Sequence, residues 1–221
     1  MPDLDTSLHT DMLASFHRQN SLARRLYRGL RRELSGDNIY GMAWGDPETE
    51  APLKFIRNRW VLPYVHGDQT ALEIGPGGGR WTRYLVGFER LYVVDFYPDL
   101  LTELKKRFDR PNMVFVQNTG TDFPGVPEGR IDFLFSFGVF VHLDPPLIQC
   151  YLASMRDVLA PGGNAVIHYS DKTKIMAVKN PTFSDNDPER MRAMVTAAGF
   201  DILEEDTTTL WHSSMIRFTR A

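Results

Sequence analysis

The stretch TALEIGPGGGRWTRYL, Thr70 to Leu85, decides the fold class of this chain. Its first residues form a short apolar run typical of a buried β-strand, and a glycine-rich turn and the opening of a helix follow. Gly75, Gly77 and Gly79 give the pattern G-x-G-x-G, in which the missing Cβ atoms let a bound molecule approach the backbone. The helix would begin with unpaired N–H groups that suit ligand oxygens. The stretch therefore predicts a site for a nucleotide-like cofactor.

The spacing of the turn narrows the class of cofactor. A dinucleotide fingerprint requires glycine at the sixth position, where this chain has Arg80, and the turn lacks the Gly-Lys-Ser/Thr end of a phosphate-binding loop. Glu73 stands two residues before Gly75, which gives acidic-x-G-x-G-x-G. This pattern resembles the first motif of class I S-adenosylmethionine-dependent methyltransferases.

Strand and helix patterns alternate along the rest of the chain. Apolar runs predict strands at residues 71–74, 91–95, 113–118, 131–137, 164–170, 200–206 and 213–220. Helical patterns lie at residues 100–108, from 145 to the Pro-Gly-Gly at 161–163, and at 188–198. Such alternation predicts a mostly parallel sheet with helices on both faces, and ligands beyond the carboxyl ends of its strands.

Four further segments extend the resemblance to class I methyltransferases over residues 68–221. They are LEIGPGGG, VVDFYP, FLFSFGVFVHLD and LAPGGNAVIH. The resemblance implies a doubly wound, Rossmann-like α/β fold with seven strands, mostly parallel, of which the last is antiparallel. It also implies methyl transfer from S-adenosylmethionine, with Glu73, Gly75 and Gly77 among the cofactor-binding residues.

Two neighbouring residues follow the second predicted strand and are candidates for the adenosine part of the cofactor. Asp95 lies twenty residues after Gly75, where a carboxylate in nucleotide-binding α/β folds accepts the ribose hydroxyls. The alternative is that Asp95 caps the helix beginning near Pro98. Phe96 would pack on the adenine ring or serve the core.

The resemblance assigns cofactor contacts to two later segments. Asp122 and Phe123 stand in the loop after the third strand, where such methyltransferases contact adenine. Phe137 follows the fourth strand and inherits a place beside the methionine moiety. Glu73 would accept hydrogen bonds from the ammonium group, or else serve as a partner within the turn.

His142 is the candidate general base, because a hydroxyl acceptor must lose a proton and histidine titrates near neutral pH. Packing or hydrogen bonding is the alternative role for this residue. His142, Asp144 and Asp171 could also hold Mg²⁺, which would make a hydroxyl more acidic. Nothing in their spacing requires a metal, so the sequence predicts no metal site.

The acceptor is expected to be a small molecule, and a sugar is one candidate. The segments WGDPE to PLKFIRNRWVLPYV and HYSDKTK resemble bacterial saccharide methyltransferases, such as the mycobacterial enzymes that methylate mannose oligosaccharides. Trp44, Tyr169 and Asp171 are the candidate acceptor-binding residues. Aromatic residues that could line a dry pocket are Trp44, Trp60, Phe137, Phe140 and Tyr169.

Two alternatives to O-methylation remain open from the sequence. Methylation of an amine is one, although FGVFVHLD stands where many amide and nucleobase methyltransferases carry Asn/Asp-Pro-Pro-Tyr/Phe. A cofactor-binding module without catalysis is the other. The sequence fixes neither the acceptor, nor the position methylated, nor the oligomeric state.

Residues 1–67 are expected to form an N-terminal helical and lid segment before the cofactor-binding domain at 68–221. Helical patterns cover residues 5–19 and 21–34, and the second places five arginines on one face. That face is either solvated or attracts an acidic ligand, partner or surface. Residues 40–65 mix aromatic, charged and turn residues, as a lid across the cofactor site would.

Composition excludes several classes of protein. The 221 residues carry a net charge of −3, so no global basic field favours nucleic acid. No apolar run is long enough to span a membrane, and the N-terminus does not read as a signal peptide. The single cysteine suits a reducing compartment. We therefore expect a cytoplasmic protein that binds neither membranes nor nucleic acid.

Overall fold

The computed structural model describes residue 41 and residues 44–220, all within one compact unit. The helices expected over residues 5–19 and 21–34, together with the arginine-rich face, lie outside these residues. The segment of α2 (Ala51–Ile56) is described, and it packs on the sheet through Leu53 and Ile56. The predicted domain boundary after residue 67 stays a prediction.

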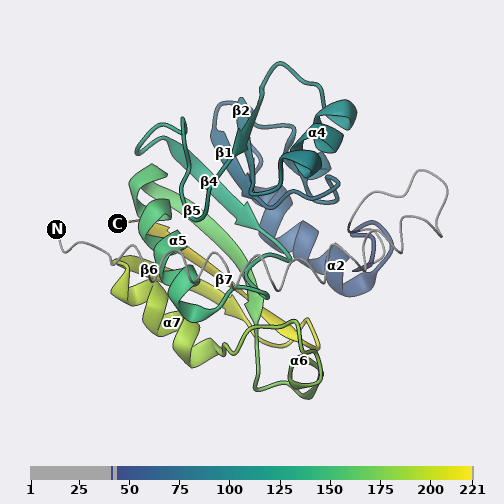
Figure 1. Cartoon of the computed structure of the whole chain (residues 1–221), viewed down its shortest axis with the longest axis vertical. Coiled ribbons are helices and arrows are strands. Elements are labelled where there is room, and N and C mark those ends of the chain that lie inside the picture. The colour runs from purple at the N-terminus through teal and green to yellow at the C-terminus, as the bar shows by residue number, and fades with distance from the viewer. Residues whose placement is uncertain (1–40, 42–43, 221) are drawn as a thin grey trace. The chain divides into compact units, whose positions relative to one another are not determined.

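Seven strands form one sheet in the described part of the chain (Figure 1). They are β1 (Thr70–Ile74), β2 (Arg90–Asp95), β3 (Met113–Gln117), β4 (Ile131–Ser136), β5 (Leu159–Ser170), β6 (Phe200–Asp206) and β7 (Ser213–Arg220). The order across the sheet is β3-β2-β1-β4-β5-β7-β6. Strands β1 to β5 pair in parallel, whereas β7 is antiparallel to both β5 and β6. The expected doubly wound, mostly parallel sheet with an antiparallel last strand is confirmed.

The position of β1 defines where a ligand would bind. From β1 the chain continues to β2 and β3 on one side, and it then returns to β4 on the other side. The strand order therefore reverses between β1 and β4, and open α/β sheets bind ligands at the carboxyl ends of such a pair. Gly75 follows β1 directly and Phe137 follows β4 directly.

Helices lie between the strands, and several begin with proline. They are α2, which continues as a π-helical turn (Arg57–Val61) and a 3-10 turn (Leu62–Tyr64), then α3 (Thr82–Leu85), α4 (Pro98–Arg107), α5 (Pro145–Val158), α6 (Ile175–Val178) and α7 (Pro188–Ala197). Proline suits the first helical turn, where its missing N–H would have no partner. The Asp187 side chain also caps α7 by accepting a hydrogen bond from the Arg190 N–H. No helix among the described residues is long and apolar enough to cross a membrane.

Both faces of the sheet are covered. One set of alternate strand residues, which includes Phe133, packs with α2, α3 and α4 in a single hydrophobic cluster. Helices α5 and α7 contact each other and cover the opposite face (Figure 1). Trp60 and Phe140, which were expected as pocket-lining candidates, are 1% and 0% exposed. That expectation is wrong for both residues, because they belong to the core.

The helix-to-strand connection LAPGG differs from expectation. The sequence predicts that α5 extends to Pro161, but α5 ends at Val158 and β5 begins at once at Leu159. Residues 160–163 form a bulge, since Leu159 pairs with Ile131 and Asn164 pairs with Phe133. A Cβ on Gly163 would lie 2.7 Å from the Ile131 carbonyl oxygen, so only glycine fits there without movement.

Gly163→Ala should lower the free energy of unfolding by about 1–3 kcal/mol, because the new methyl group would press on backbone atoms that cannot swing away. Urea denaturation measures the change. Gly67→Ala is the matched control, since its Cβ would meet no atom closer than 3.9 Å. Equal denaturation midpoints for the two variants would contradict the packing described for the bulge.

Candidate active site

The glycine turn after β1 is built on close backbone approaches. Gly75, Gly77 and Gly79 have φ values of +67°, +55° and +90°, which other residues rarely adopt. A Cβ on Gly75 would lie 2.1 Å from Cγ2 of Val139, and one on Gly79 would lie 2.3 Å from the ring of Phe108. Helix α3 behind the turn has four residues, so the turn itself must supply the seat for a ligand.

Glu73 lies buried on β1 and accepts a hydrogen bond from Thr82, the first residue of α3. Its side chain is 2% exposed, and Oε2 accepts a hydrogen bond of 2.6 Å from the Thr82 hydroxyl. Burial raises the pKa of Glu73 to about 8, since the Thr82 hydrogen bond offsets only part of the cost of desolvation. A buried carboxyl with this pKa is held mostly protonated at neutral pH until a cation approaches.

Asp95 ends β2 at the same edge of the sheet. It is 7% exposed, and Oδ1 accepts a hydrogen bond of 2.9 Å from the Tyr97 N–H, at the N-cap of α4. Tyr97 is the N-cap residue of α4, and no side chain caps the first N–H groups of this helix, so the Asp95 contact is not the capping role considered as the alternative. Phe96 is partly exposed and meets the Tyr97 ring edge-on at 5.3 Å.

Asn118, directly after β3, carries a buried acceptor without a partner among the described residues. Its Nδ2 donates to the Gly120 carbonyl at 2.8 Å and to the Tyr151 hydroxyl at 3.1 Å, whereas Oδ1 is buried and receives no hydrogen bond. Buried polar atoms are nearly always paired, so an orphaned acceptor beside β2 indicates a missing donor. The sequence placed Asn118 at a strand end but gave no sign of this orphaned atom.

The loop after β3 holds the two other candidates for adenine contact. Phe123 is buried and packs on Tyr151 at a centroid distance of 6.1 Å. Asp122 is exposed and accepts a hydrogen bond of 2.9 Å from the Thr119 N–H. Of these two side chains, that of Phe123 therefore lies in the core and that of Asp122 at the surface.

Phe137 stands at the centre of the carboxyl edge. Its ring stacks on His168 with a centroid distance of 4.0 Å and an interplanar angle of 12°. Trp81, the N-cap residue of α3, also packs on Phe137, with 4.7 Å between the ring centroids. The β4 end is thereby joined to the turn on one side and to β5 on the other.

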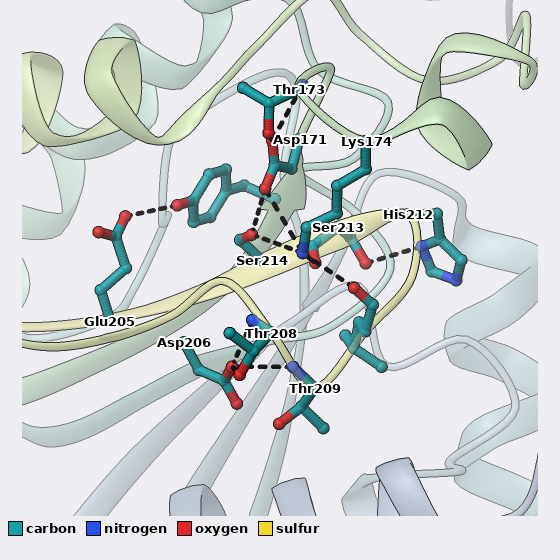
Figure 2. Close-up of polar contacts among 12 residues, drawn as sticks. Asp171, Thr173, Lys174, Glu205, Asp206, Thr208, Thr209, His212, Ser213 and Ser214 are labelled. Carbon is teal, nitrogen blue, oxygen red and sulfur yellow. Dashed lines mark hydrogen bonds and ion pairs between the residues drawn. The ribbon is translucent and has the colours of Figure 1, made fainter.

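A hydrogen-bonded chain runs from the loop after β4 to the loop before β7. The Gly138 N–H donates to His168 Nδ1 at 3.1 Å, so the proton of this neutral ring is on Nε2. His168 Nε2–H donates to the Ser213 hydroxyl at 2.5 Å, which in turn donates to His212 Nδ1 at 2.7 Å. Burial lowers the pKa of both histidines, which keeps the rings neutral. His212 and Ser213 are seen together in Figure 2.

The sequence did not predict this series of hydrogen bonds between Gly138, His168, Ser213 and His212. His168 was expected to be structural, and its buried position agrees with that placement. His212 has no motif around it, and only the pairing of β5 with β7 brings its loop to His168. No local sequence signal could have found it.

His142 lies in the loop after β4 with its tautomer fixed by a backbone contact. Nδ1 is 2.8 Å from the carbonyl oxygen of Thr182, which can only accept, so Nδ1 carries the proton. Nε2 therefore keeps its lone pair, and no described residue donates to it. Burial lowers the pKa of His142 despite the opposing Thr182 bond, so the ring is neutral at pH 7. Phe183 lies edge-on between His142 at 5.5 Å and His212 at 5.3 Å.

Tyr169 is bound within the sheet rather than open to a ligand. The side chain is 0% exposed, and its hydroxyl donates to Glu205 Oε1 at 2.6 Å. This contact ties β5 to β6. The contact with Glu205 does not favour the predicted role of Tyr169 as an acceptor-binding residue.

Asp171 is likewise occupied by neighbouring groups. It accepts hydrogen bonds of 2.6 Å from the Ser214 hydroxyl and 2.5 Å from the Thr173 hydroxyl, and Lys174 Nζ lies at 3.4 Å (Figure 2). Although burial works against the charge, these donors lower the pKa of Asp171. Lys174 also donates to the Leu210 carbonyl, so the cluster anchors the loop that carries His212.

The positions of His142 and Asp171 also concern the Mg²⁺ ligands considered from the sequence. The described residues contain no group of three or more His, Cys, Asp or Glu side chains that could hold a metal ion. His142, Asp144 and Asp171 are not brought together as such a group.

Trp44 lies close to the glycine turn through its backbone. The carbonyl oxygens of Trp44 and Gly45 each accept a hydrogen bond of 3.1 Å from Arg80 Nη1. The indole ring itself is 64% exposed. Two open hollows lie at the other end of the sheet, lined by Thr70 and Asp132 among others, and they are remote from all of these groups.

Solved structures share this architecture at low sequence identity. A methyltransferase dependent on S-adenosylmethionine from Mesorhizobium loti gives a TM-score of 0.66 at 13% identity, over 78% of this chain and 99% of that one. The N-methyltransferase NodS from Bradyrhizobium japonicum, solved with S-adenosylhomocysteine, gives 0.65 at 19% identity, over 88% and 97%. A Haloferax volcanii methyltransferase complex with the activator Trm112 gives 0.65 at 17%, over 81% and 91%. At these identities the likeness establishes the fold.

Sequence comparison identifies the domain. Residues 71–163 match the family model described as a methyltransferase domain, and this region contains the glycine turn, Asp95, Phe137 and His142. The comparison with curated proteins gives no match. The chain therefore contains a region that matches a methyltransferase domain, within a fold shared with S-adenosylmethionine-dependent methyltransferases.

The residues at the carboxyl edge of the sheet fit S-adenosylmethionine. The turn accepts no side chain at Gly75, since a Cβ there would lie 2.1 Å from Cγ2 of Val139, and its positive φ values suit a backbone that itself contacts a ligand. The orphaned Asn118 Oδ1 offers an acceptor at the β3 end, next to the Asp95 carboxylate at the β2 end. An acceptor beside an acid suits the amino and hydroxyl donors of a nucleoside.

Without cofactor, the protein should lose stability relative to Glu73→Gln as the pH rises from about 4.5 toward 8. In this range the unfolded Glu73 carboxyl ionises while the folded one stays protonated, which favours unfolding. The penalty grows by about 1.4 kcal/mol for each pH unit crossed and is constant above pH 8. Urea titrations of both proteins at several pH values measure it.

Glu128→Gln, at an exposed position, is the control for the loss of one glutamate outside this site. A Glu73→Gln difference that is independent of pH would contradict the burial of a protonated carboxyl at this site.

Proposed function

We propose that the enzyme transfers a methyl group to a hydroxyl of a small molecule, with His142 as the general base. The observation that carries this proposal is the Nδ1–H bond of His142 to the Thr182 carbonyl, which leaves Nε2 as a proton acceptor. A neutral, oriented imidazole at the carboxyl edge is what hydroxyl methylation needs, since an alcohol is a poor nucleophile until its proton has a destination.

The proposed cofactor contacts follow the edge of the sheet. Asp95 accepts the ribose hydroxyls, as acids do at this place in nucleotide-binding sheets. Gly75 and Gly77 let the backbone approach the cofactor, and Glu73 pairs with its ammonium group. Contacts proposed for the adenine ring come from Phe96, Asn118, Asp122 and Phe123.

Bound S-adenosylmethionine supplies an activated methyl group on a sulfonium. Phe137 stands directly after β4, where it is proposed to lie beside the methionine moiety. The transfer is an in-line displacement, so alignment of the acceptor oxygen matters most. His142 Nε2 accepts the hydroxyl proton as the oxygen–methyl bond forms and the carbon–sulfur bond breaks.

A saccharide is the proposed class of acceptor. The exposed Trp44 ring offers a flat apolar face near the glycine turn, of the kind on which a sugar ring packs. His212 would present Nε2–H as a donor, because Ser213 occupies its Nδ1. Tyr169 and Asp171 remain proposed acceptor residues, although both are held by neighbours in the structure.

A labelled-methyl assay against a panel of sugars, phenols and amines tests the proposal. Transfer to a hydroxyl compound, with an ether product found by mass spectrometry, is the expected result. Exclusive transfer to amines would replace O-methylation by N-methylation. Cofactor binding without transfer to any compound of the panel would favour a non-catalytic module.

His142→Ala should lower kcat by about 10²–10⁴-fold, which is the usual contribution of a positioned base. Affinity for S-adenosylmethionine, measured by calorimetry, should stay nearly unchanged. In the wild type, kcat should hold steady through neutral pH and fall only below the lowered pKa of His142, where the ring takes up a proton. The variant should lose this acid limb.

His66→Ala is the matched control, because His66 is exposed beside the hollow at the opposite end of the sheet. It should leave kcat and its pH profile unchanged. Retention of full kcat by His142→Ala would remove His142 as the base.

A further inference from the structure

His142 and His212 flank the same aromatic ring. The Phe183 ring meets His142 edge-on at a centroid distance of 5.5 Å and His212 edge-on at 5.3 Å. His212 also lies 6.2 Å from the His168 ring, which stacks on Phe137 directly after β4. Two loops that are far apart in the sequence therefore bring both histidines to the same edge of the sheet, beside the proposed cofactor site.

The tautomer of His212 is set from the backbone. The Gly138 N–H occupies Nδ1 of His168, so the proton of that ring is on Nε2 and is donated to the Ser213 hydroxyl. The Ser213 side chain is buried, and its own proton has one partner among the described residues, Nδ1 of His212, at 2.7 Å (Figure 2). Buried hydroxyls are nearly always paired, so Nδ1 of His212 accepts and the ring proton lies on Nε2.

The outer ring nitrogens of the two histidines have opposite hydrogen-bonding roles. Nε2 of His142 accepts, because Nδ1 donates to the Thr182 carbonyl oxygen. Nε2–H of His212 donates, and no residue in the described part of the chain accepts from it. Both rings are partly exposed, whereas His168 and Ser213 are buried. An acceptor molecule bound at this edge would thus meet one base and one donor of fixed orientation.

We propose that His212 holds the oxygen next to the methylated hydroxyl, so that the acceptor is a vicinal diol such as a sugar offers. The methylated hydroxyl gives its proton to His142 and its lone pair to the methyl group, as the oxygen–methyl bond forms and the carbon–sulfur bond breaks. A hydrogen bond from His212 to that same oxygen would make it a weaker nucleophile, so the donor suits a second oxygen. Because both histidines contact Phe183, the second oxygen belongs on a neighbouring carbon.

His168 and Ser213 are positioning residues in this proposal, because they keep the proton of His212 on Nε2 without touching the acceptor. The inference rests on the proposed O-methylation and names the acceptor class of that same site. It makes no use of a metal ion, since the donor that holds the second oxygen comes from the protein.

The tautomer is tested without any acceptor. In the wild-type protein with ¹⁵N-labelled histidine, long-range proton–nitrogen spectra show which ring nitrogen carries the proton, and His212→Phe identifies the His212 signals. The proton is expected on Nε2. Ser213→Ala should give a mixture of tautomers, since Nδ1 then loses its donor. Ser214→Ala is the matched control and should leave the tautomer unchanged, because Ser214 bonds to Asp171 and Lys174 instead.

The acceptor class is tested by removing single hydroxyls. The probes are the methyl glycosides of mannose, glucose and galactose, with the monodeoxy analogues of each sugar that is methylated. In the wild type, one analogue without a hydroxyl adjacent to the methylated position should lose about 10-fold or more in kcat/KM, because the His212 donor is left unpaired. Analogues without a distant hydroxyl should lose less.

His212→Phe removes the donor and keeps an aromatic ring against Phe183. It should lower kcat/KM for the parent sugar about 10-fold and use the adjacent-deoxy analogue equally well, so that the wild-type preference falls to about one. His212→Gln keeps an N–H donor and should recover part of the preference. His66→Ala, at the opposite end of the sheet, should retain all of it.

Three results would overturn the proposal. A proton on Nδ1 of His212 in the wild type would exclude the donor role. Equal losses on the parent sugar and its adjacent-deoxy analogue in His212→Phe would mean that His212 only shapes the loop before β7. Full use by the wild type of every analogue that retains the methylated hydroxyl would exclude a diol. Transfer to amines alone would instead overturn the proposed O-methylation, and the diol contact with it.

Discussion

The contact that the rest of the site depends on is the approach of the β1 turn to the loop after β4. Gly75 and Val139 meet so closely that a Cβ on the glycine would lie 2.1 Å from a valine methyl. The Gly75 backbone thus packs directly on the Val139 side chain at the switch point of the sheet. The carboxyl ends of β1, β2 and β4 lie side by side there, with Asp95 at the end of β2 and Phe137 directly after β4.

The second constraint is the burial of two ionisable side chains, Glu73 and Arg80, beside the glycine turn. Glu73 is held as a protonated acid, and Arg80 is a buried cation with no carboxylate in ion-pair distance among residues 41 and 44–220. Around Phe183 the histidines have complementary roles, because His142 presents an acceptor nitrogen and His212 a donor. Cofactor side and acceptor side are thereby linked through His168, which stacks on Phe137.

The sequence predicted most of the fold, because strand runs and turn residues are local signals. It misjudged the LAPGG segment, where a β-bulge formed by pairing with β4 replaces the expected turn. The strand ends that carry Asp95 and His142 were also foreseen. His212 and the orphaned Asn118 oxygen were not, since both depend on contacts between distant strands. Arg80 was noticed only as a departure from a dinucleotide pattern, because burial without a counter-ion is invisible in sequence.

A crystal structure with S-adenosylhomocysteine tests the central claim most directly. The account predicts the nucleoside at the carboxyl edge of β1 and β2, with both ribose hydroxyls on Asp95 and the amino-acid end within the glycine turn. A ligand bound at the opposite end of the sheet, or one whose ribose makes no contact with Asp95, would contradict it.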